Sequence, residues 1–347
     1  MAGAGVGLES FDFLGTGSRQ TQPKKSMTPA QPLIIDWQGR MDFDGQTARF
    51  IDRVQTASGA VTLHSGVLEC IFTNPVNFSS QQGTVSSQQT DIARITCGNG
   101  VQIKSLSEAD GKQKSVENLF VRDLFFDRFT GDVRGTGPGR LTSVRRGGGG
   151  LPMGTPGLPG QPVQQQPPVS ESADDLGMTF LCVDFQRGFT GNMNQRQMEF
   201  QQRVETIWGP VDSWEGSLDL HDPKGLPDKA IAVTSDTLGI GQTPSVPGVP
   251  GQTIELSAGG NVLVEGDSFT ARSARLSFSE SKDLLIFEGD GRSDAQLFRQ
   301  ERVGGPTSSA SAGKILYWRK YNRVEVKDAR YLDLDQIGGA NMPQVPR

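Results

Sequence analysis

Pairs of carboxylates are the residues of this chain whose spacing comes closest to known chemistry. Examples of such pairs are Asp42 with Asp44, Glu288 with Asp290, and Asp333 with Asp335. Two carboxylates can hydrolyse a glycosidic bond when they face each other across it. Here each pair alternates along a strand-like segment or falls in a turn, and nothing distinguishes one pair from the others. We therefore expect no catalytic site.

Histidine and cysteine provide no clearer centre. The chain has two histidines, His64 and His221, and neither has a second metal-type ligand at a recognised spacing. Its three cysteines, Cys70, Cys97 and Cys182, lack the CxxC or Cys/His spacing of zinc sites. We expect them to be small buried apolar residues, with a disulfide between Cys70 and Cys97 as the alternative. No metal site or cofactor is predicted, and the protein is not expected to be an enzyme.

The composition favours a β-rich chain. Among 347 residues there are 44 glycines and 20 prolines, which indicate many turns rather than long helices. The net charge of −5 and the absence of a basic stripe argue against a nucleic-acid partner. The chain has no apolar run of about 18 residues that could form a membrane-spanning helix. Its first residues do not have the pattern of a signal peptide, so we expect a protein that stays inside the cell or, preferably, part of a longer chain.

An internal repeat is the most informative pattern in the sequence. Residues 50–68 align without a gap on residues 200–218, at a constant offset of 150 residues. The matched pairs are Phe50 with Phe200, Arg53 with Arg203, Val54 with Val204, Thr56 with Thr206, Gly59 with Gly209, Val61 with Val211, Gly66 with Gly216 and Leu68 with Leu218. A repeated β unit predicts a stacked architecture, because one unit cannot bury its apolar face alone.

Glycine- and proline-rich segments divide the chain into two expected β units. The predicted order is a disordered segment over 1–32, a first unit over 33–146, a linker over 147–177, a second unit over 178–334 with loops at 239–251 and 304–313, and a flexible tail over 335–347. Short strands with alternating apolar residues recur in both units, so the fold class is all-β.

The second unit carries a family resemblance. Its matching residues are Gly260, Asn261, Val262, Val264, Phe269, Ala271, Ala274, Leu284 and Gly289, followed by a strand over 323–326. These residues resemble the repeat of the OstA-like family of lipopolysaccharide-transport periplasmic proteins, and two earlier segments resemble it more loosely. The resemblance implies an open, solenoid-like β-jelly-roll of stacked antiparallel strands. It also implies a periplasmic or cell-envelope location.

The resemblance further implies an apolar groove that holds the acyl chains of a lipid or a lipopolysaccharide-like amphiphile. Candidates for its lining are Val54, Phe200, Val204, Val262, Val264, Phe269, Leu276, Phe278 and Ile286. Candidates for contacts with a lipid head group are Arg272, Arg275 and Arg319. Other β-jelly-roll envelope proteins would join by pairing at edge strands. The alternative is a structural β-scaffold of the envelope or surface with a closed core, in which the same residues pack on one another.

Overall fold

The structure is a computed structural model of the 347-residue chain. It describes residues 33–75, 91–109, 112–146, 177–219, 226, 227, 230–243, 253–266, 268–279, 282, 284–300, 307–318, 321 and 323–333. The expected segments 1–32 and 335–347, and the linker 147–177 apart from its last residue, lie outside these residues. No helix in the described residues has the length and apolar character needed to cross a membrane.

The fold is built from β-strands joined into a 20-stranded network. The first half contributes β1 (Ile34–Asp36), β2 (Met41–Phe43), β3 (Thr47–Ser58), β4 (Val61–Phe72), β5 (Ile92–Gly98), β6 (Val101–Ala109), β7 (Lys112–Val121), β8 (Asp123–Asp127), β9 (Asp132–Thr136) and β10 (Gly139–Arg146). The second half contributes β11 (Met178–Phe185), β12 (Gly188–Asn192), β13 (Gln197–Val211), β14 (Ile231–Thr243), β15 (Thr253–Gly266), β16 (Phe269–Ser279), β17 (Leu284–Glu288), β18 (Ala295–Gln300), β19 (Thr307–Trp318) and β20 (Arg323–Asp333). The predicted all-β class is confirmed.

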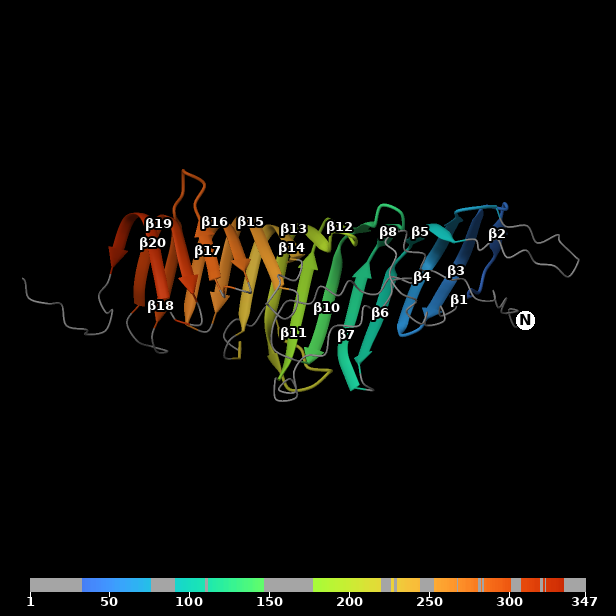
Figure 1. Ribbon diagram of the computed structural model, residues 1–347, viewed down its shortest axis with the longest axis horizontal. Helices are drawn as coiled ribbons and strands as arrows, with labels where there is room; N and C mark the ends of the chain where they lie inside the picture. Colours follow the sequence, from blue (N-terminus) through green and yellow to red (C-terminus); the bar gives the residue numbers. More distant parts are fainter. Residues whose placement is uncertain are drawn as a thin grey trace, which may run out of the picture.

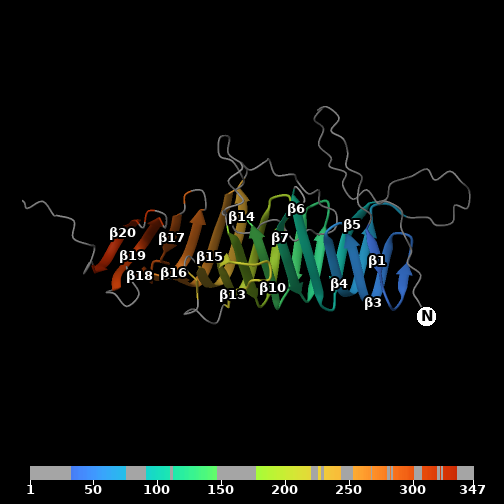
Figure 2. The ribbon, with the colours of Figure 1, turned by 90° about the horizontal axis from the view of Figure 1, so that it is seen from below.

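The strands lie side by side along an elongated body, from the blue end near β1 to the red end near β20 (Figures 1 and 2). Long strands contribute to two layers. Residues 61–64 of β4 pair with β6, whereas residues 67–72 of the same strand pair with β5. In β13, residues 197–201 pair with β12, and residues 205–211 pair with β11. We call the layer that contains β5, β8, β9, β12 and β17 layer 1, and the layer that contains β6, β7, β10, β11 and β18 layer 2.

Hydrogen bonds close part of this network into a ring. Ten antiparallel strands form it in the order β4, β5, β8, β9, β12, β13, β11, β10, β7 and β6, and the remaining strands extend beyond it at both ends. The ring closes because β4 and β13 each belong to both layers. This part of the molecule is therefore not the open, solenoid-like arrangement that the resemblance implied.

The long strands β3 and β13 bend at a β-bulge in the same way. Asp52 and Arg53 have φ values of 71° and 45°, and Gln202 and Arg203 have φ values of 66° and 49°. At both places the register with the next strand shifts, and the strand changes its partner on the other side. Non-glycine residues rarely adopt positive φ, and a bulge of this kind bends a strand and increases its twist. The bulges therefore turn each strand from one layer into the other.

One apolar core lies between the two layers and runs from Leu33 to Val326 without interruption at the predicted linker. The two predicted units are joined directly, because β10 of the first pairs with β11 of the second, from Gly139 opposite Phe185 to Arg146 opposite Met178. A second, smaller cluster covers the outer face of β10, β11 and β13. The two sequence units thus share one interior.

Two expected loops are shorter than the sequence indicated. β14 continues to Thr243, inside the expected loop 239–251, and β19 begins at Thr307, inside the expected loop 304–313. In β14, Leu238 and Ile240 are 0% and 2% exposed and alternate with glycines that face outward. Glycine lowers strand propensity, but the burial of every second side chain outweighs that preference here.

Candidate functional site: the interior between the two layers

The predicted groove residues come together in the structure with one exception. Seven are buried in the central core, namely Val54, Phe200, Val204, Val262, Val264, Phe269 and Leu276, and Phe278 is half-buried against the same core. Ile286 is half-buried and does not belong to that core, because its neighbours Leu285 and Phe287 on β17 take the inward positions. Side chains alternate between the two faces of a strand, so the inward face of β17 is the one opposite to Ile286.

The predicted head-group residues lie on the outside. Arg272 and Arg275 of β16 are both exposed, whereas the neighbouring Ala271 and Leu276 point into the core. Arg319 lies outside the described residues. The two described arginines are therefore separated by the thickness of the sheet from the interior that they were expected to serve.

The bends in β3 and β13 are supported by matching aromatic pairs. Trp37 packs on Phe50 with ring centroids 5.0 Å apart, and Phe185 packs on Phe200 at 5.2 Å. Phe50 and Phe200 are 150 residues apart, whereas Trp37 and Phe185 are 148 apart, so an alignment without gaps misses the second equivalence. The backbone repeats as well, since Gln38 N donates to Asp52 O at 3.0 Å and Gln186 N donates to Gln202 O at 2.9 Å. The repeat thus extends upstream of the segment that the sequence identified.

Downstream, the alignment of residues 50–68 on 200–218 is wrong beyond Thr56 and Thr206. β3 ends at Ser58 and turns back, so Val61 opens a new strand, whereas β13 continues to Val211. Leu68 is then part of the central core, while its aligned partner Leu218 packs against the outer cluster. A two-residue turn and a continued strand can share glycines at the same spacing, which explains the false match.

The interior of layer 2 contains a group of polar side chains that the sequence did not single out. On β6, β7 and β10 the inward side chains near residues 101, 121 and 139 are apolar. Further from these ends, the inward side chains are polar. The polar members, which we call the polar block, are Ser105, Ser107, Ser115, Glu117, Ser143 and Arg145.

The pairing register places these six residues in two rows. Ser105 lies opposite Glu117, which lies opposite Ser143 on its other side. In the next row, Ser107 lies opposite Ser115, and Ser115 lies opposite Arg145. The row on the other side of Glu117 consists of Ile103, Leu119 and Leu141, all members of the apolar core. The polar block is therefore continuous with the interior.

An ion pair lies at the centre of the polar block. Arg145 Nη2 donates to Glu117 Oε1 at 2.5 Å, and Glu117 is only 4% exposed. Burial raises the pKa of the Glu117 carboxyl above its ordinary value, although Arg145 opposes this effect through its charge and its hydrogen bond. A carboxylate this deeply buried is stable only with such a partner.

Two polar atoms of the block have no hydrogen-bond partner in the protein. They are Ser143 Oγ, in a residue that is 2% exposed, and Arg145 Nε. A buried donor or acceptor without a partner costs about 1–3 kcal/mol, and most buried polar groups in folded proteins are satisfied. These two atoms are consequently available to a ligand or to water.

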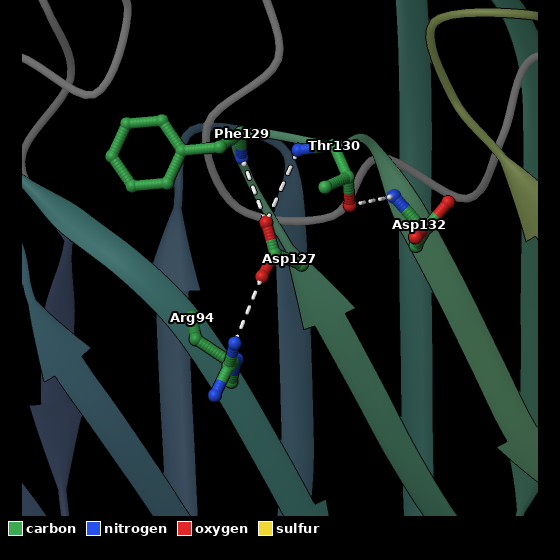
Figure 3. A network of polar contacts seen from close by, with 5 residues as sticks. All are labelled: Arg94, Asp127, Phe129, Thr130 and Asp132. Carbon is green, nitrogen blue, oxygen red and sulfur yellow. Dashed lines mark hydrogen bonds and ion pairs between the residues drawn. The ribbon is translucent and has the colours of Figure 1, made fainter.

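A stiff turn at the rim of layer 1 lies between β8 and β9 (Figure 3). Asp127 Oδ1 accepts hydrogen bonds from Phe129 N at 3.0 Å and Thr130 N at 3.1 Å, and Asp127 Oδ2 accepts one from Arg94 at 3.2 Å. Burial acts to raise the pKa of Asp127, but these hydrogen bonds outweigh it and lower the pKa. The ring of Phe129 is 70% exposed and points away from this polar network. The turn therefore presents an aromatic side chain from a fixed backbone.

The carboxylate pairs have structural roles where the structure describes them. Asp44 accepts hydrogen bonds from the backbone of its own turn, and so does Asp290. Glu288 accepts a hydrogen bond from Lys314 at 2.7 Å, and Asp42 forms an exposed ion pair with a neighbouring arginine. Asp335 lies outside the described residues. None of these contacts aligns two carboxylates across a common space.

The three cysteines are free and buried. Burial raises the pKa of the Cys70 and Cys182 thiols to about 12, and it also raises that of Cys97. Thiols with raised pKa values remain protonated at neutral pH and are poor nucleophiles. Within the described residues, no group of three histidine, cysteine or acidic side chains is arranged to hold a metal ion.

A shallow depression of about 610 Å³ lies on the outer side of the bends, lined by Arg187, Gln201, Gln202, Asp236 and Thr237. The lining residues come from the bulge of β13, from the neighbouring β14 and, for Arg187, from the corner between β11 and β12. A scan against protein-family models finds no match for the chain, and a search of curated proteins finds no match either.

Proposed function

We propose that this protein is a non-enzymatic lipid-holding module of the cell envelope, similar to the OstA-like lipopolysaccharide-transport proteins. It would shelter acyl chains of an amphiphile between its two layers and join other β-modules at its end strands. The observation that carries this proposal is the single apolar core that follows the long axis from Leu33 to Val326. A continuous apolar interior across both sequence units is what a lipid path along the molecule requires.

The connections between strands support a folded jelly-roll architecture for this module. β5 and β6, β7 and β8, β9 and β10, and β11 and β12 are each joined by a short corner, at residues 98–101, 121–123, 136–139 and 185–188. Each of these pairs therefore resembles one long strand bent between the layers, as β4 and β13 are. β1 and β2, and β17 and β18, are joined by longer corners of the same kind, because the two strands of each pair share their neighbouring strands. The hairpins of the described residues lie at the far ends of the strands. In the described residues, no strand pairing joins the two layers along those ends.

The energetics are sufficient for binding. Burial of one methylene contributes about 0.8 kcal/mol, so an acyl chain of ordinary length gains about 10 kcal/mol before the costs of binding. Part of that gain is needed to displace side chains that now pack on one another, such as Val204 and Val264, both 0% exposed. Half-buried Phe278, nearer the ends of the strands, marks the part of the interior that a chain would reach first.

The two ends of the body are suited to pairing with other β-modules. β20 pairs only with β19 among the described strands, and Val324 and Val326 on it are only half-buried against the core. At the other end, β1 and β2 pair only with β3, and Ile34 is 55% exposed. An unpaired edge next to incompletely covered apolar side chains can accept a further strand.

Native mass spectrometry of the purified chain, followed by identification of co-purified lipid, tests the proposal. We expect a stoichiometric acylated lipid that is lost in Phe278→Asp and in Val264→Asp but retained in Ser277→Asp. Ser277 is the matched control because it is exposed on the same strand as Phe278. A folded wild-type protein that carries no lipid and takes up no added lipopolysaccharide would contradict the proposal.

A structural β-scaffold with a closed core is the second candidate. It is favoured by the burial of the predicted groove residues, since Phe200, Val204 and Val264 are all 0% exposed. In that case Phe278→Asp and Val264→Asp would reduce stability alone, and the wild-type protein would bind no amphiphile. The same experiment therefore separates the two functions.

A further inference from the structure

The polar block gathers six polar side chains in layer 2, whereas the neighbouring inward row carries only the isolated Thr56 and Thr206 among apolar residues of the described strands. Ser115, Glu117 and Ser143 are 7%, 4% and 2% exposed, so they are as inaccessible as the leucines beside them. Replacement of a buried ion pair by well-packed apolar residues is often neutral or stabilising. Packing alone thus gives no reason for a charged pair and four serines at these positions.

On the basis of the lipid-holding function proposed above, we infer that the polar block binds a neutral, hydroxyl-rich group such as the sugar of a glycolipid head. Ligand sites are typically apolar with a few convergent polar groups that orient the ligand. The polar block has this arrangement, because it borders the apolar row of Ile103, Leu119 and Leu141 in the same layer.

The charges of the block decide which head group fits. Glu117 neutralises Arg145 through their 2.5 Å contact, so the block carries no net charge. A phosphate would meet the Glu117 carboxylate and find the guanidinium already engaged. A sugar hydroxyl both donates and accepts, so it can use the carboxylate, the guanidinium and the serine hydroxyls together.

The unpartnered atoms point to the same class of ligand. Ser143 Oγ can donate and accept, whereas Arg145 Nε can only donate. Ser143 lies directly opposite Glu117 in the register, and Arg145 lies two residues further along β10. A hydroxyl-bearing ring between these residues would satisfy both atoms.

Binding of probes that share one dodecyl chain tests this inference. The probes are dodecyl maltoside, dodecylphosphocholine and dodecanoate, each below its micelle concentration, together with free maltose. Isothermal titration calorimetry of the full chain measures their affinities.

We expect wild type to prefer the maltoside. Glu117→Gln and Ser143→Ala should each weaken maltoside binding by about tenfold, as expected for one lost hydrogen bond in a buried site. Dodecanoate binding should stay unchanged in Ser143→Ala and should strengthen in Glu117→Gln, which leaves the charge of Arg145 uncompensated.

Asp184→Asn is the matched control. Asp184 forms a bidentate pair with Arg140 of the same strand β10, at 2.6 and 2.7 Å, but on the exposed face. This variant should bind every probe like wild type. Ser115→Ala serves as a further test if Glu117→Gln does not fold, and it should also weaken maltoside binding selectively.

The possible outcomes separate this inference from the function on which it rests. If wild type binds the dodecyl probes without preference, or if Glu117→Gln and Ser143→Ala weaken all of them equally, the head-group site is overturned and the lipid-holding function stands. If no dodecyl probe binds wild type, both are overturned. If free maltose binds with the same dependence on Glu117 and Ser143, the sugar chemistry is supported, and the source of the sugar is a free saccharide.

Discussion

Two neighbouring inward rows of layer 2 differ in character, because one runs through the polar block and the row beside it is mainly apolar. On β6, β7 and β10 one row consists of Ser105, Glu117 and Ser143. The row beside it holds Ile103, Leu119 and Leu141. Through Val183 and Thr206 the register continues this second row beyond the ring, where its members are all apolar, namely Val233, Val264, Ala271, Leu297 and Ala310. Both rows lie in continuous antiparallel pairing, so strand geometry does not explain the difference. Under the inference above, the apolar row serves folding, whereas the polar block also binds a ligand.

The largest expected effect is in the apolar row. Val264→Asp places a carboxylate at a position that is 0% exposed and has no nearby cation among its inward neighbours in the register. We expect a loss of about 4 kcal/mol in the free energy of unfolding, measured by urea denaturation. Ser277→Asp on the exposed face should change it by less than about 0.5 kcal/mol. A loss below about 1 kcal/mol for Val264→Asp would mean that this row is hydrated, and the contrast between the two rows would disappear.

Removal of one partner in the polar block should have the next largest effect. Glu117→Ala leaves Arg145 without its counter-ion, and we expect a loss of about 2–3 kcal/mol. The double variant Glu117→Leu/Arg145→Met should stay within about 1 kcal/mol of wild type, because apolar side chains can fill the same space. Urea denaturation of both variants checks this expectation. A double variant as unstable as the single one would make the ion pair a requirement of folding.

The pH dependence of stability should also distinguish the polar block. The native pKa of Glu117 is raised above 4.5 by burial, so the native state retains this proton to higher pH than the unfolded state does. The contribution of Glu117 to stability is then greatest below its unfolded pKa and declines as the pH rises through the native pKa. Relative to Glu117→Gln, wild type should therefore be more stable near pH 4.5 than near about pH 7.5, as measured by thermal unfolding at both values. The opposite sign would show that Arg145 outweighs burial.

The smallest effect is expected on the outer face. Asp184→Asn breaks an ion pair in which the side chain of Arg140 is 60% exposed. Exposed pairs contribute about 0–1 kcal/mol and are screened by salt, so we expect a loss below about 1 kcal/mol that shrinks as salt is added. Chemical denaturation at low and high ionic strength measures it. A loss as large as that of Glu117→Ala would show that the position of the pair, inside or outside, does not matter.

Alternation predicted the inward faces of Val262–Val264 and Leu276–Phe278 correctly. Eight of the nine lining residues that the resemblance implied belong to one core. The exception is Ile286, because the four consecutive apolar residues from Leu284 to Phe287 fit either face of a strand. In such a run only the partners on β16 and β19 determine which side chains face inward.

The repeat shows a similar limit. The shared Phe, Arg and Val of β3 and β13 predicted two equivalent strands, and their bulges at Asp52–Arg53 and Gln202–Arg203 have matching backbone angles. The spacing of the glycines beyond Thr56 predicted a longer match that the structure does not have. The equivalence of Trp37 and Phe185 became visible only in their contacts, because two residues are inserted between the matched segments.

The sequence by itself determined the all-β class, the repeated strand pattern and the apolar alternation, because these depend on residues close together along the chain. The tertiary structure alone decided that both units share one core and that the polar block exists. Glu117 and Arg145 are separated by 28 residues, and each appears in the sequence as an ordinary charged residue in a strand. The register between β7 and β10 brings them together inside the protein, and burial then gives their charges a significance that no local pattern reveals.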